Sequence, residues 1–174
     1  MMNLLLFKTK KGYSLVEVVV SLAIIAIIIT ILFNTVLITI RISYKNFARS
    51  LIREELSEIS TLISRDVRNA DQILSCTGSA CEMVRDGVII RWTLCDSVSV
   101  CRQESQDGIN YVNLYQTLDF IIINLLNFEN GFGVDENLAQ RNIVFTMVAE
   151  HSNPDLSISN VIRQQSVSTR NFSR

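Results

Sequence analysis

An acidic residue at the edge of a long uncharged stretch is the residue whose chemistry most needs an explanation. Glu17 stands immediately before residues 18–40, which carry no formal charge. A carboxylate inside a membrane helix costs up to about 2.5–3.5 kcal/mol at the centre and less near an end. A cut after Gly12 would create an amine at Tyr13, about one helical turn away. Glu17 therefore either snorkels toward the interface or pairs with the amine of a neighbouring chain.

The uncharged stretch itself predicts a transmembrane helix. As a helix, residues 18–40 would reach about 35 Å, enough for a hydrocarbon core of about 30 Å. A cleaved secretory signal is the main alternative, but its apolar region has about 7–15 residues and ends at small residues. This stretch is longer and continues to Arg41 and Lys45 without such a site. In lipid the backbone must satisfy its own hydrogen bonds, so a helix is the expected structure of a single span.

The residues around Glu17 also resemble a known processing signal. Three lysines (Lys8, Lys10 and Lys11), a glycine and Tyr13-Ser14-Leu15-Val16-Glu17 lead into the aliphatic stretch. This order resembles the prepilin signal of type IV pilins and type II secretion pseudopilins. The resemblance covers residues 8–40 and implies that a prepilin peptidase cuts after Gly12 and methylates the new N-terminal Tyr13. It also implies that Glu17, the acid at the fifth mature position, guides assembly.

One residue within the span departs from that resemblance. Many major pilins carry a proline near the middle of the span, where this chain has Asn34. A kink or local melting of the helix at this place is therefore left open. A weaker resemblance, to the minor pilins of the J-type and W-type groups, rests on Leu126-Asn127-Phe128 and on Gln164-Gln165-Ser166-Val167-Ser168-Thr169-Arg170-Asn171 near the C-terminus.

Composition and motifs argue against an enzyme. The 174 residues are 48% hydrophobic, which fits one span and one modest domain. The net charge of -1 argues against general electrostatic binding of nucleic acid. The sequence contains no nucleophile elbow, phosphate loop, dinucleotide fingerprint or H-E-x-x-H motif. The single histidine, His151, precedes Ser152-Asn153-Pro154 and is interpreted as a loop residue. No catalytic residue, cofactor or metal is expected.

Four cysteines offer either zinc ligands or disulfides. They are Cys76, Cys81, Cys95 and Cys101. Structural zinc usually needs two short C-x2-4-C pairs separated by more chain, whereas the spacings here are C-x4-C and C-x5-C. Disulfides are therefore favoured, because they persist in small domains outside the membrane. Of the three connectivities, the two local loops Cys76–Cys81 and Cys95–Cys101 are preferred.

Other polar and aromatic residues are interpreted as structural. Asp66, Asp71 and Asp86 do not have the spacing of a calcium loop, so we interpret them as exposed carboxylates near turns. Trp92 is expected to pack on a strand rather than to stack on a ligand, and the same holds for Tyr111 and Tyr115.

The helix is expected to continue after the span as an amphipathic half, residues 41–75. Its apolar residues recur every three or four positions and predict one covered face. They are Tyr44, Phe47, Ala48, Leu51, Ile52, Leu56, Ile59, Leu62, Ile63, Val67, Ala70, Ile73 and Leu74. On another face lie Arg41, Lys45, Arg49 and Arg53. A solvated face near the membrane explains these cations better than contacts with headgroups or nucleic acid.

The rest of the chain predicts strands, from their β-branched and aromatic content. The expected strands are residues 87–94 and 97–101, which form a hairpin around Asp96, and then 109–114, 119–128, 142–149 and 159–170. A helix with an apolar stripe followed by a mostly antiparallel sheet predicts an α+β fold. The same order is that of the pilin fold.

The expected organisation has four parts: a leader (1–12), a transmembrane or filament-core helix (13–40), the amphipathic half (41–75) and an extracytoplasmic β-rich domain (76–174). Lysine and arginine are balanced across the span and do not orient it, so the orientation follows from the cysteines and the signal. The resemblance implies a minor pilin or pseudopilin with a prepilin peptidase, other pilins, an inner-membrane platform and lipid as partners. A subunit that binds DNA or a surface, and a single-span protein that never assembles, are the alternatives.

Overall fold

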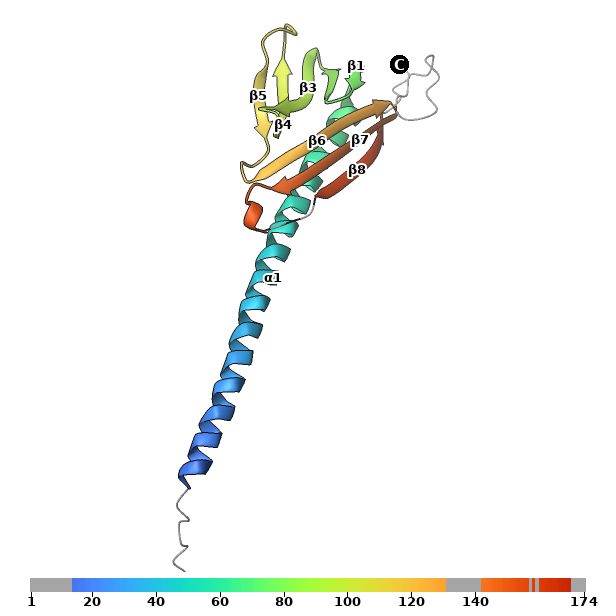
Figure 1. Cartoon of the computed structure of the whole chain (residues 1–174). Coiled ribbons are helices and arrows are strands. Elements are labelled where there is room, and N and C mark those ends of the chain that lie inside the picture. The colour runs from blue at the N-terminus through green and yellow to red at the C-terminus, as the bar shows by residue number, and fades with distance from the viewer. Residues whose placement is uncertain (1–13, 131–141, 157, 159, 170–174) are drawn as a thin grey trace, which may run out of the picture. The chain divides into compact units, whose positions relative to one another are not determined.

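The computed structural model describes residues 14–130, 142–156, 158 and 160–169. Within them the chain forms one long helix, α1 (Leu15–Asn69), followed by strands and a short 3-10 helix, Pro154–Leu156 (Figure 1). The chain divides into two compact units, Met1–Ser43 and Tyr44–Arg174, and α1 contributes residues to both.

The first unit is a helix whose described side chains are all exposed. Residues 15–43 are helical without interruption at Asn34, and most of them are aliphatic. By length and composition α1 is able to cross a membrane. The hydroxyls of Ser21, Thr30, Thr35 and Thr39 each donate to the carbonyl four residues earlier, at 2.7–2.9 Å. These polar groups are thus satisfied inside the helix, as an apolar solvent requires.

In the second unit, α1 buries one apolar face. Its buried aliphatic residues are Ala48, Ile52, Leu56, Ile59, Ile63 and Val67, spaced by three or four. Tyr44 and Phe47, which were expected on this face, are exposed. The helix also ends at Asn69, earlier than the predicted residue 75. The amide of Asp71 donates to the carbonyl of Val84 at 2.8 Å, so cross-strand pairing replaces the helical hydrogen bonds.

Five strands form an antiparallel sheet in the order of the sequence. They are β1 (Gln72–Thr77), β2 (Ala80–Arg85), β3 (Val88–Cys95), β4 (Ser99–Ser105) and β5 (Val112–Gln116). Asp96 and Ser97 both have positive φ, which matches the twist of a tight hairpin between β3 and β4. This hairpin confirms the predicted one. The strands β1 and β2 were not predicted as strands.

Three further strands form a second antiparallel sheet. They are β6 (Ile121–Asn130), β7 (Asn142–His151) and β8 (Val161–Ser168), in the order β6-β7-β8. The antiparallel α+β architecture is confirmed, and the structure adds that the strands divide between two sheets. The amide of Phe128 donates to the carbonyl of Gly78 at 2.6 Å, and the amide of Ile123 to that of Val98 at 2.8 Å. These two bonds join the sheets.

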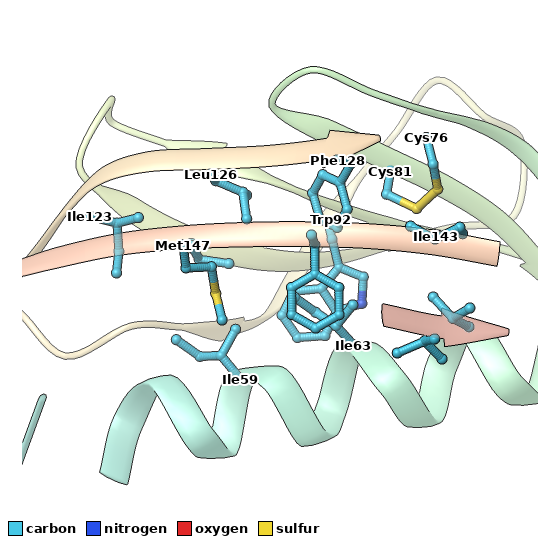
Figure 2. Close-up of a cluster of buried hydrophobic side chains, with 14 of the residues drawn as sticks. Ile59, Ile63, Cys76, Cys81, Trp92, Ile123, Leu126, Phe128, Ile143 and Met147 are labelled. Carbon is cyan, nitrogen blue, oxygen red and sulfur yellow. A yellow bond between two sulfur atoms is a disulfide. The ribbon is translucent and has the colours of Figure 1, made fainter. Parts of the chain in front are cut away.

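One hydrophobic core lies between the two sheets and the buried face of α1. Figure 2 shows Ile59 and Ile63 of α1 beside Trp92, Phe128 and Met147 of the strands, and all five side chains are almost fully buried. The apolar stripe of α1 thus serves as the covering layer that the sheets need. The result is a pilin-like α+β architecture.

Candidate functional site

Glu17 lies in the first turn of α1. The helix begins at Leu15, and the amide of Val18 donates to the carbonyl of Ser14 at 3.2 Å. A negative charge at this position is favoured by the helix dipole. The Glu17 side chain is exposed, and among the described residues none donates a hydrogen bond to its carboxylate. The carboxylate is therefore available to a group from outside this part of the chain.

The predicted processing residues, Gly12 and Tyr13, lie outside the described residues. The cut after Gly12 and the pairing of Glu17 with the amine of Tyr13 therefore stay predictions. The structure does show that the carboxylate and the first turn of the helix share one end of α1. An amine placed there by processing would meet an acid that has no partner among the described residues.

The four cysteines form two disulfides. Cys76 of β1 is bonded to Cys81 of β2, and the two residues are direct cross-strand partners. Cys95 of β3 is bonded to Cys101 of β4, across the β3–β4 hairpin. These are the two local loops preferred from the spacing. No free thiol is left among the four to bind zinc.

A buried ion-pair cluster attaches the end of α1 to the five-stranded sheet. Asp66 is fully buried, and its Oδ2 accepts from Nε of Arg102 at 2.6 Å and from Nε1 of Trp92 at 3.1 Å. Its Oδ1 accepts from Nη1 of Arg85 at 3.2 Å. A buried carboxylate persists only when such donors replace its water. The interpretation of Asp66 as an exposed carboxylate was therefore wrong.

The position of Asp66 in the apolar pattern of α1 is a sequence signal for this cluster. Asp66 follows Ile63 by three positions and precedes Ala70 by four, so it lies in register with the apolar stripe. A charged residue in that register predicts a buried partner. The partners could not be identified, because Arg85, Trp92 and Arg102 come from three different strands.

The other two acids lie near turns, as interpreted, whereas His151, interpreted as a loop residue, belongs to a strand. Asp71 and Asp86 are exposed, and the amide of Asp86 donates to Oδ2 of Asp71 at 2.8 Å. His151 is the last residue of β7, and its Nδ1 accepts from the amide of Asn153 at 3.0 Å. Its ring also packs 5.9 Å from that of Phe120. These contacts are structural.

Two further polar contacts hold α1 to the strands. The hydroxyl of Tyr115 donates to Oε1 of Glu55 at 2.7 Å; burial, reinforced by this carboxylate, raises the pKa of Tyr115. Ser60 donates to Oε1 of Gln165, whose Nε2 donates to Oγ of Ser64 at 3.0 Å. Glu55, Ser60 and Ser64 are all buried. Each contact fixes one strand on the helix.

Comparison with known proteins identifies the N-terminal segment. Residues 7–33 match the family model described as the prokaryotic N-terminal methylation motif. The chain therefore carries the type IV pilin-type signal, and this signal contains Gly12, Tyr13 and Glu17. No match to a curated protein or to a solved structure was found. Proteins with this signal are processed by a prepilin peptidase and assemble with other pilins.

Proposed function

We propose that this protein is a minor pilin or pseudopilin, a structural subunit of a type IV pilus-like filament or of a type II secretion pseudopilus. The observation that carries the proposal is the methylation motif at residues 7–33, which includes the start of an aliphatic helix whose side chains up to residue 43 are all exposed. Glu17 is the one acid in residues 14–43. A helix that is apolar on all sides is suited first to lipid and then to a core of similar helices.

The proposed driving force of assembly is burial of the aliphatic helices against one another. The exposed side chains of this segment include Val20, Ile24, Ile28 and Ile31, each at least half exposed in the isolated chain. Removal of that apolar surface from water favours packing of the helices. This force has no direction, so it does not fix the register of one helix against another. A carboxylate that pairs with a neighbour's N-terminal amine would fix it, so Glu17 determines position rather than strength.

The proposed topology places residues 1–12 in the cytoplasm as a leader, residues 13–40 in the membrane and the β-rich residues 76–174 outside. Two disulfides support an oxidising compartment for the strands, since such bonds are rare in the cytosol. A prepilin peptidase, an inner-membrane assembly platform and other pilins would be the partners. As a minor subunit, the protein would have its role at the filament tip.

Mass spectrometry of the mature N-terminus, on protein isolated from the native host, tests the proposal. The expected N-terminal residue is Tyr13 carrying one methyl group, about 14 Da heavier than the unmodified residue. Gly12→Val is the matched variant, in which the leader should stay attached. Recovery of Met1, or of a start other than Tyr13, from the unaltered chain would overturn the proposal in favour of a single-span membrane protein.

A further inference from the structure

Strand β8 forms an open edge of the three-stranded sheet (Figure 1). Its residues pair with β7 in an unbroken register, from Val161 opposite Ala149 to Ser168 opposite Asn142. On its other side no described strand pairs with it. β8 contains no proline and a single charge, Arg163. Its outward main-chain N–H and C=O groups are therefore presented as a regular row.

The other sheet edges carry the protection that β8 lacks. β1 and β6 lie against each other, joined by the bridge between Gly78 and Phe128. β5 is interrupted by a register shift opposite Arg102 and Gln103, and a bulge of this kind disfavours pairing with another strand. Among the described strands, β8 is therefore the edge that is best suited to accept one more strand.

A hollow rich in positive charge lies between α1 and β8. This basic hollow has a volume of about 470 Å³ and is lined by Thr61, Ser64, Arg65, Arg68, Asn69 and Gln165. Both arginines are exposed, and no residue of the described part forms an ion pair with either. The lining contains no acid. Its chemistry is complementary to a carboxylate held by a guanidinium pair and by neutral donors.

Gln165 places the basic hollow beside the open edge. Its side chain reaches α1, where it contacts Ser60 and Ser64, so the odd-numbered positions of β8 face the helix. Val167 on the same face is buried, whereas Ile162 on the opposite face is 68% exposed. Because side chains alternate along a strand, a strand added to β8 would direct every second side chain toward α1.

We propose that the β8 edge binds an extended segment of a partner protein as an added strand, with an Asp or Glu side chain of that segment in the basic hollow. Main-chain hydrogen bonds would supply affinity and the carboxylate would supply selectivity. A protein segment fits better than nucleic acid, because a nucleic acid uses no strand edge and the chain has a net charge of -1. The site uses residues of the second unit alone, so it does not depend on the filament role.

The test measures binding of a short acidic peptide to the full chain in detergent. The probe is a fluorescently labelled peptide of alternating threonine and valine with one central glutamate. Fluorescence anisotropy measures its binding. We expect binding that weakens by about tenfold or more in Arg65→Gln/Arg68→Gln, as for loss of a charged hydrogen bond. Arg53→Gln, which removes an arginine of α1 that does not line the basic hollow, should bind as the unaltered chain does.

Two altered peptides separate strand addition from simple charge attraction. A peptide with glutamine in place of glutamate should lose about tenfold in affinity. Two further peptides are N-methylated at every second amide, one in each register, and their affinities should differ. Methyl groups on the edge that pairs with β8 should abolish binding, whereas methyl groups on the free edge should not. Equal binding of the two, no binding of the acidic peptide at about 1 mM, or arginine-dependent binding of an oligonucleotide in its place would overturn the proposal.

Discussion

Asp66 of α1 and Arg102 of β4 form a buried ion pair in which Oδ2 and Nε lie 2.6 Å apart. Asp66 is fully buried, and the side chain of Arg102 is 9% exposed. Arg102 also pairs with Glu104, whose Oε1 lies 2.7 Å from Nη1. The pair connects the helix to the five-stranded sheet through a hydrogen bond, which is directional, whereas apolar packing is not. It therefore fixes the position of the sheet on the helix.

Asp66→Asn is expected to destabilise the second unit by about 1.5–3 kcal/mol, because the buried Arg102 loses one of its two charged partners and keeps only Glu104. Urea denaturation followed by the fluorescence of Trp92, the single tryptophan, measures the free energy of unfolding. Asp155→Asn, at an exposed acid, should stay within about 0.5 kcal/mol of the unaltered chain. An equally small change in Asp66→Asn would show that the pair contributes nothing.

Stability is expected to fall at acid pH in part through Asp107. The amides of Asn110 and Ile109 donate to its carboxylate, with help from Ser105, and they lower the pKa of Asp107 in the folded chain. A lowered folded pKa gives stability that is present above the unfolded value of about 3.9 and is lost as pH falls below it.

Asp107→Asn should therefore be less stable than the unaltered chain at pH 7, and the difference should shrink as pH falls below about 4. Thermal unfolding at a series of pH values measures it. Asp119→Asn, at another exposed acid, is the matched control. A difference between Asp107→Asn and the unaltered chain that does not change with pH would contradict the assignment.

The two disulfides are expected to differ in their access to reductant. Cys76, Cys81 and Cys101 are buried, whereas Cys95 is partly exposed, so Cys95–Cys101 should be reduced first. Brief treatment with reductant, alkylation and peptide mass spectrometry identify which cysteines react. Each loop is short, so loss of one disulfide should cost about 2 kcal/mol. Earlier labelling of Cys76 and Cys81 would contradict this order.

Glu17→Ala is expected to be cleaved and inserted normally but to enter filaments poorly. The substitution removes the acid that would pair with a neighbour's amine, and a loss of about 1.4 kcal/mol corresponds to a tenfold drop in incorporation. Quantitative immunoblots of sheared filaments and of membranes measure this. Ser21→Ala, one turn further along α1, is the control. Unchanged incorporation of Glu17→Ala would remove the assembly role given to the acid.

The sequence by itself determined the N-terminal segment, because this segment depends on local properties. The order from the lysines to Glu17 needs no tertiary contact to be recognised, and the length and composition of residues 18–40 indicate a membrane helix directly. The β3–β4 hairpin followed in the same way from its turn residues and β-branched strands. The short spacing of the cysteines favoured the local pairs that the structure contains.

Tertiary structure alone decided which polar residues are buried and where α1 ends. Asp66 was expected to be exposed, but it is buried because donors from distant strands reach it. Glu55 is likewise buried beside the hydroxyl of Tyr115. Ile73 suits a helix as well as a strand, and pairing with β2 made it a strand residue. Burial, pairing and sheet number depend on contacts between residues far apart in the chain, and a pattern read along one segment does not contain them.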